Sequence, residues 1–175
     1  MKKIIPVFLL ALLFSSVLSA QNQFQVLVER PGEKSLKGII SREILEADSS
    51  FTGWYVANQK AYTPHSLALA ALKQHGDSIQ VIAIMGTWCE DSHFIIPKFF
   101  ALADAAGFSD KHITLFGTDR DKKTLGNLCE SLNVKNVPTL IVMKEGKELG
   151  RVIEYGKTGL WDKELGQVIN SGFAQ

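Results

Sequence analysis

The chain has 175 residues, with 19 Lys or Arg against 18 Asp or Glu, which gives a formal net charge of +1. This near-neutral charge offers no electrostatic basis for binding nucleic acid or an anionic membrane. The length is enough for one domain with a substantial core, and such a domain does not need the one disulfide that two cysteines could form.

The first twenty residues have the pattern of a secretory signal peptide. Lys2 and Lys3 precede an apolar run, and the small residues Ser19 and Ala20 stand before a polar segment. The run is short for a membrane span, and an uncleaved N-terminal anchor is the alternative. Cleavage would leave 17 basic residues against 18 acidic ones. We therefore predict a periplasmic or secreted protein with no stable membrane association once residues 1–20 are removed.

Residues 21–61 are predicted to form an N-terminal extension. The stretch FQVLVER alternates apolar and polar residues as an edge strand does, and PGEK is a turn sequence. Ser41 is a suitable N-cap for a short helix through REILEAD. The spacing of Phe51, Trp54 and Tyr55 fits a helix, but WYV is equally compatible with a strand.

Residues 62–175 alternate helix and strand patterns. The stretch TPHSLALAALKQHG predicts a helix with Thr63 as N-cap, Pro64 at the first helical position and Gly76 as its end. The stretch SIQVIAIM, residues 78–85, is a nearly unbroken apolar run, as in a central strand that is covered on both faces.

The next segments continue this alternation. The stretch SHFIIPKFFALADAAG predicts a helix with Pro97 as a kink and Gly107 as its end, HITLFGT predicts a strand, and TLGNLCESLN a short helix. The runs TLIVMK and ELGRVIEY flank a short turn and predict a hairpin, and TGLWDKELGQVIN predicts a closing helix. Because helix-linked strands pair in parallel and hairpin strands antiparallel, we expect an α/β fold with a mixed sheet and helices on both faces.

Cys89 is the candidate nucleophile, because it stands where the helix after the central strand begins. Unpaired backbone N–H groups and the helix dipole favour a thiolate at that position. Glu90 and Asp91 suit the first helical turn but repel an adjacent thiolate. The environment of Cys89 therefore combines two opposing electrostatic effects.

This arrangement resembles the thioredoxin-like family. The shared features are a central strand ending in Trp-Cys, a helix starting at that cysteine, a proline eight residues later and a Val-Pro-Thr hairpin start, within roughly residues 62–169. The resemblance implies a three-layer α/β/α fold, with Cys89 as nucleophile, Trp88 as its aromatic neighbour and Pro138 as a cis-proline beside the thiol. Exported proteins with this Trp-Cys-x-Asp-Ser variant are similar to thioredoxin-like proteins of Gram-negative bacteria.

Ser92 stands where the family's second cysteine would be. A hydroxyl group cannot attack a mixed disulfide, although it can donate a hydrogen bond to the Cys89 thiolate. Release of Cys89 from a mixed disulfide would therefore need an external thiol reductant or the substrate's own second thiol. This chemistry favours isomerisation or removal of mixed disulfides over net reduction, and the same residues equally fit a site that has lost catalysis.

The predicted partner-binding residues are Trp88, Val137, Pro138 and Thr139. Proline lacks an N–H group and so leaves room for a partner chain, while the Val137 backbone can pair with an extended substrate segment. A trans proline that merely starts a strand is the alternative reading.

Two other residues could take part in the chemistry. Cys129 falls on an apolar helical face, and in the resembled fold that helix lies across the sheet from Cys89, so we expect a core residue and not a resolving thiol. His93 is expected to be solvated on the first helical turn, with a role as general base as the alternative. Ala83 stands where thioredoxins usually carry a buried acid.

No metal and no organic cofactor are predicted. Cys89, Asp91 and His93 are ligand types, but their spacing at a helix start does not bring all three together. The sequence therefore predicts an exported protein that uses Cys89 in thiol–disulfide exchange with protein thiols or disulfides. The competing prediction is a thioredoxin-fold binding module without redox turnover.

Overall fold

The computed structural model describes residues 23–174 apart from Pro31 and Ala61. The predicted signal peptide, residues 1–20, lies outside the described residues, so its cleavage stays a prediction. In the described part of the chain no helix is long and apolar enough to cross a membrane.

The extension forms two strands and two helices: β1 (Phe24–Arg30), β2 (Glu33–Ile40), α1 (Arg42–Ala47) and α2 (Thr52–Lys60). The rest of the chain follows as α3 (Ser66–His75), β3 (Gln80–Met85), α4 (Glu90–Ala106), β4 (Ile113–Gly117), α5 (Leu128–Ser131), β5 (Thr139–Lys144), β6 (Lys147–Ile153) and α6 (Trp161–Ser171). Short 3-10 turns lie at Gly76–Ser78, Asp110–His112 and Leu125–Asn127. This order confirms the alternation predicted for residues 62–175.

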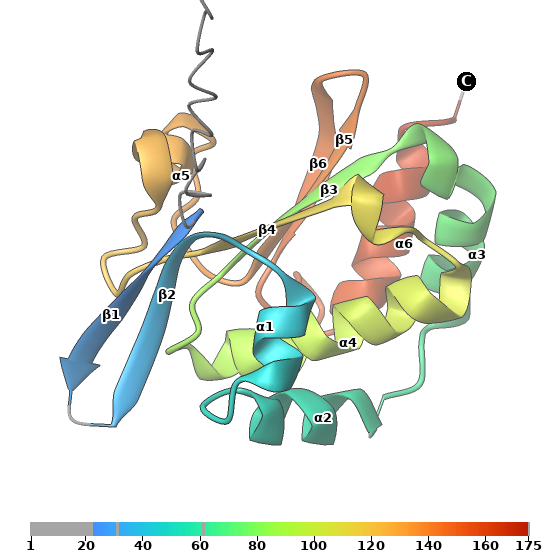
Figure 1. The fold of residues 1–175 in the computed structure, drawn as a ribbon. Coiled ribbons are helices and arrows are strands. Elements are labelled where there is room, and N and C mark those ends of the chain that lie inside the picture. Colours follow the sequence, from blue (N-terminus) through green and yellow to red (C-terminus); the bar gives the residue numbers. More distant parts are fainter. Residues whose placement is uncertain (1–22, 31, 61, 175) are drawn as a thin grey trace, which may run out of the picture.

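Six strands form one mixed sheet in the order β1-β2-β4-β3-β5-β6 (Figure 1). Strand β3 lies inside the sheet, pairs in parallel with β4 and antiparallel with β5, and β5 and β6 form the predicted hairpin. The extension belongs to the same sheet, because β2 pairs antiparallel with β4 and β1 forms the outer edge. The edge strand is confirmed, and β2 was not predicted.

The two faces of the sheet are covered unequally. Alternate residues of β3 point to opposite faces, so Val81 and Met85 join the large core under α1, α2, α3, α4 and α6. Ile84 joins a smaller core with Ile141 and Cys129 of α5 on the other face (Figure 1). The structure is thus the expected α/β fold with helices on both faces, and among the described helices α5 is the one that packs on the second face.

The predicted start of α3 is wrong. The helix begins at Ser66, and its N-cap is His65, whose Nδ1 accepts a hydrogen bond from the Leu67 N–H at 3.2 Å. The Asp162 carboxylate accepts hydrogen bonds from the His65 N–H and from the Tyr62 hydroxyl, 97 and 100 positions away. These long-range bonds hold the segment before Ser66 extended, which the local Thr-Pro pattern does not reveal.

Helix α4 has the predicted ends. Cys89 is its N-cap, Pro97 lies inside it, and Gly107 ends it in the left-handed conformation with φ of 71°. Glycine adopts this conformation without steric penalty. The start of α4 is therefore the point at which the candidate nucleophile is held.

Candidate functional site

Cys89 is held between the end of the central strand and the first turn of α4. Its N–H donates to the Gly86 carbonyl at 3.0 Å, and its carbonyl accepts from the His93 N–H at 3.0 Å. Its side chain is half-buried and its sulfur is free. Gly86 is required in this loop, since a Cβ there would lie 2.6 Å from the Trp88 ring. The loop therefore presents a reduced, partly accessible thiol at a helix N-terminus.

The segment before β5 lies against this thiol. The Cys89 Sγ contacts the Val137 carbonyl oxygen at 3.3 Å, in the geometry of an S–H hydrogen bond. The Val137–Pro138 peptide bond is cis, and the Pro138 carbonyl accepts from the Glu154 N–H at 2.8 Å. The structure thus brings together Cys89, Val137 and Pro138. The Thr139 side chain is buried and donates to the Asn136 carbonyl at 2.7 Å, so it does not face a partner.

Ser92 is fully buried behind the thiol. Its hydroxyl oxygen accepts a hydrogen bond from the Gly86 N–H at 3.2 Å. Among the described residues, no hydrogen bond joins Ser92 to the Cys89 sulfur. The side chain therefore stabilises the loop before α4, and the hydrogen bond that it could donate to the thiolate is not formed.

Trp88 is positioned by groups that follow β4. Its Nε1–H donates to the Thr118 carbonyl at 2.9 Å, and the Arg120 guanidinium lies 5.4 Å from its ring centroid. Arg120 in turn forms an ion pair with Glu33 of β2. Arg120 therefore links the extension to Trp88, the residue that precedes the nucleophile.

Tyr155, which no sequence pattern singles out, lies beside the first turn of α4. Its hydroxyl donates to Asp91 Oδ1 at 3.0 Å, and its ring packs against Phe94 with centroids 5.6 Å apart. Partial burial, and then this bond to a carboxylate, raise the pKa of Tyr155 above its ordinary value. No local sequence signal links Tyr155 to Asp91, because the two residues are 64 positions apart.

The expectation of a solvated His93 is wrong. Its ring stacks on Trp54 of α2, with centroids 4.1 Å apart and planes inclined by 14°. Its Nε2 lies 2.8 Å from the Thr87 carbonyl, which can only accept, so Nε2 carries the donated proton. Burial lowers the pKa of His93, which favours the neutral ring at neutral pH. The extension packs against α4 through Trp54 and partly buries this side chain.

Comparison with known proteins identifies the family. Residues 68–164, more than half of the chain, match the family described as Thioredoxin. The chain belongs to the thioredoxin family. Over 91 residues this thioredoxin-family protein is 31% identical to a thioredoxin of Echinococcus granulosus, covering 52% of this chain and 78% of that one. Over 102 residues it is 32% identical to thioredoxin H2-2 of Oryza sativa subsp. japonica, and the match covers 58% of this chain and 70% of that one.

Solved structures show the same fold at lower sequence identity. A protein of unknown function from Pseudomonas aeruginosa superposes with a TM-score of 0.54 at 14% identity, over 76% of this chain and 92% of that one. An HIV epitope-scaffold gives the same TM-score and identity over 79% and 94%. These two likenesses concern the fold alone. Family membership supports thiol–disulfide redox chemistry at the level of the family.

The second cysteine of this thioredoxin-family protein is a core residue. Cys129 is free and buried in the smaller core, as predicted. Burial, with a contribution from the nearby Glu130 and Asp119 carboxylates, raises the pKa of its thiol. Burial and the raised pKa both disfavour a reactive thiolate at Cys129. In the described residues no group of three or more His, Cys, Asp or Glu side chains could hold a metal ion.

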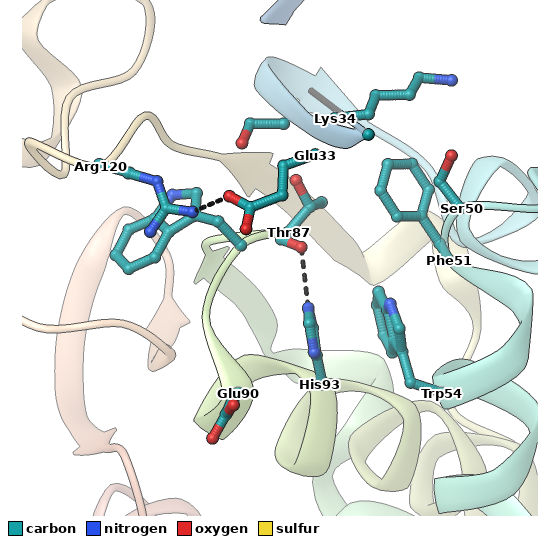
Figure 2. A pocket seen from close by; sticks show the side chains of 12 residues that line it. Glu33, Lys34, Ser50, Phe51, Trp54, Thr87, Glu90, His93 and Arg120 are labelled. Carbon is teal, nitrogen blue, oxygen red and sulfur yellow. Dashed lines mark hydrogen bonds and ion pairs between the residues drawn. The ribbon is translucent and has the colours of Figure 1, made fainter. Parts of the chain in front are cut away.

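A cavity of about 370 Å³ lies between the extension and the first turn of α4, and Figure 2 shows the side chains that line it. The extension contributes Glu33, Lys34, Phe51 and Trp54, among others, to its lining. The active-site loop and the start of α4 contribute further residues, including Trp88, Glu90 and His93. The thioredoxin core and the extension therefore build this cavity together.

Proposed function

We propose that this thioredoxin-family protein carries out thiol–disulfide exchange through the single thiol of Cys89, on protein thiols or disulfides outside the cytoplasm. The observation that carries the proposal is the placement of the Cys89 sulfur at the N-cap of α4, in contact with Val137. A half-buried thiol at a helix N-terminus is accessible to a partner sulfur and faces the positive end of the helix dipole.

The exchange would proceed in two balanced steps. The Cys89 thiolate attacks one sulfur of a partner disulfide, a new sulfur–sulfur bond forms, and the other partner sulfur leaves as a thiolate. A second thiolate then attacks this mixed disulfide and releases Cys89. If that thiolate belongs to the partner, the partner's disulfide is rearranged without net electron transfer. If an external thiol supplies it, that thiol is left bonded to the partner sulfur, and a second external thiol must attack this bond; two external thiols are then oxidised to one disulfide for each partner disulfide reduced.

The backbone beside the thiol supports the docking of an extended partner segment. Among the described residues, no backbone carbonyl accepts a hydrogen bond from the Val137 N–H. A partner strand could therefore pair with Val137 while its own cysteine reaches Cys89. This arrangement would align the partner sulfur with the nucleophile.

Export is proposed on the pattern of residues 1–20. Expression of the full chain in a bacterial host, followed by intact-mass measurement of the protein outside the cytoplasm, tests it. Loss of the first 19 or 20 residues supports export. A full-length mass, or retention in the cytoplasm, contradicts it.

A binding module without redox turnover is the second candidate, and Ser92 is the observation that favours it. The position of the second cysteine carries a buried hydroxyl that bonds to the Gly86 backbone instead of the thiol. Refolding of scrambled ribonuclease and reduction of insulin distinguish the two functions. Wild type and Cys129→Ala should be active in refolding and Cys89→Ser inactive. Inactivity of the wild type in both assays would favour the binding module.

A further inference from the structure

The cavity is lined by both chain neighbours of the nucleophile, although the Cys89 side chain itself does not line it. Two of its lining residues, Trp88 and Glu90, flank the nucleophile directly in the sequence. Neighbouring residues of an extended chain are about 3.3 Å apart, so residues next to a partner cysteine bonded to Cys89 stay within reach of this cavity. The position of the cavity therefore suits a side chain of the partner itself.

The charged groups around the cavity already have partners. Lys34 forms an ion pair with Asp48, and Figure 2 shows the ion pair that Arg120 forms with Glu33. Glu90 is exposed, and in Figure 2 its carboxylate points away from Thr87 and His93. A charged ligand that pairs with Lys34, Arg120 or Glu33 would have to displace an existing ion partner.

Each aromatic ring that lines the cavity also has another side chain against one of its faces. His93 stacks on Trp54, the Lys34 ammonium lies 5.5 Å from the Phe51 centroid, and Arg120 lies over Trp88. A cationic ligand would therefore compete with Lys34 or Arg120 for the rings and would gain little from cation–π attraction. An uncharged ligand meets no such competition.

We infer that this cavity binds an uncharged, apolar side chain, such as Phe or Leu, within about two residues of the partner's reacting cysteine. The inference rests on the proposed exchange function and assigns its substrate preference to the extension, which supplies Phe51 and Trp54. A volume of about 370 Å³ lies within the usual range of ligand pockets and accommodates one large side chain.

The test uses short peptides whose single cysteine is bonded to thionitrobenzoate. Attack of Cys89 on the peptide sulfur releases the coloured thionitrobenzoate anion, so the second-order rate is read directly. Phe, Asn, Arg or Glu is placed at each of the two positions on either side of the cysteine. At one position at least, the Phe peptide should react roughly tenfold or more faster than the Asn peptide, and Arg and Glu should give no gain.

Two matched variants test whether the cavity causes the preference for the Phe peptide. Ser50→Trp places a large side chain at the cavity wall, whereas Ser49→Trp makes the same change at the adjacent exposed serine, which does not line the cavity. Ser50→Trp should remove the preference for Phe, and Ser49→Trp should keep both the preference and the wild-type rate of the Asn peptide within about twofold. Circular dichroism of both variants checks that the fold is retained.

Equal rates for the Phe and Asn peptides in the wild type would overturn the inference, as would an Arg or Glu preference or a Phe preference that persists in Ser50→Trp. Calorimetric binding of the same peptides with Ser in place of Cys separates this result from failure of the exchange itself. If no peptide reacts, the exchange function fails. In that case, tighter binding of the Phe peptide than of the Asn peptide supports the inference about the cavity, and equal binding overturns it.

Discussion

The sulfur of Cys89 lies 3.3 Å from the carbonyl oxygen of Val137, although the two residues are 48 positions apart. This contact joins the N-terminus of α4 to the segment that leads into β5. Because β3 and β5 are paired neighbours, the end of one strand and the start of the other meet at the same edge of the sheet. The sheet topology therefore creates the site, and the cysteine alone does not.

Ser92→Cys should convert the site to a dithiol. Residues three apart at the start of a helix lie on the same side, so the new sulfur can attack a mixed disulfide on Cys89, which the hydroxyl cannot do. We expect insulin reduction to increase by about tenfold or more. Mass spectrometry of the oxidised variant should show a link between positions 89 and 92. Ser92→Ala is the control and should not gain activity.

Trp54→Ala should expose His93 and destabilise the protein. The stacked ring is one of the groups that bury the imidazole, so its removal should raise the pKa of His93 toward the ordinary value. We expect a loss of about 2 kcal/mol in the free energy of unfolding, because Trp54 is only partly buried. NMR titration of the imidazole measures the pKa, and an unchanged value would contradict this account of its burial.

His93 should make stability fall as the pH drops below neutrality. Its pKa is lowered in the folded state, so below about 6.5 the unfolded chain binds the proton more readily than the folded protein. The contribution of His93 to the free energy of unfolding is fully present above that pH. It declines as the pH falls toward the pKa of His93 in the folded state. Urea unfolding at pH 7 and pH 5 should show a smaller difference for His93→Gln than for wild type. An equal difference in the two proteins would contradict the assignment.

Gly86→Ala should disturb the loop that carries the nucleophile. The added methyl group would lie 2.6 Å from the Trp88 ring, so the ring or the loop must move, and we expect a loss of about 1–3 kcal/mol in the free energy of unfolding. Gly53→Ala is the matched control, since nothing lies within 4 Å of its added Cβ in α2. That variant should be as stable as wild type or more stable, by about 0.5–1 kcal/mol. Thermal unfolding measures both changes.

Local sequence patterns determined the central strand and the helix that carries the thiol. The apolar run of residues 78–85 contains β3, and Cys89 and Gly107 bound α4 as predicted. These signals work because backbone conformation at a cap or inside a strand depends on the residue itself and its near neighbours. The nucleophile could therefore be placed from the sequence.

Only the tertiary structure decided the surroundings of that thiol. His93 is partly buried because Trp54 of α2 stacks on it, Ser92 bonds to the Gly86 backbone, and Tyr155, just after β6, bonds to Asp91. Each of these outcomes depends on which distant segments fold together, and burial and hydrogen-bond partners follow from that packing. The sequence by itself determined where the reactive sulfur stands, and long-range packing decided which side chains surround it.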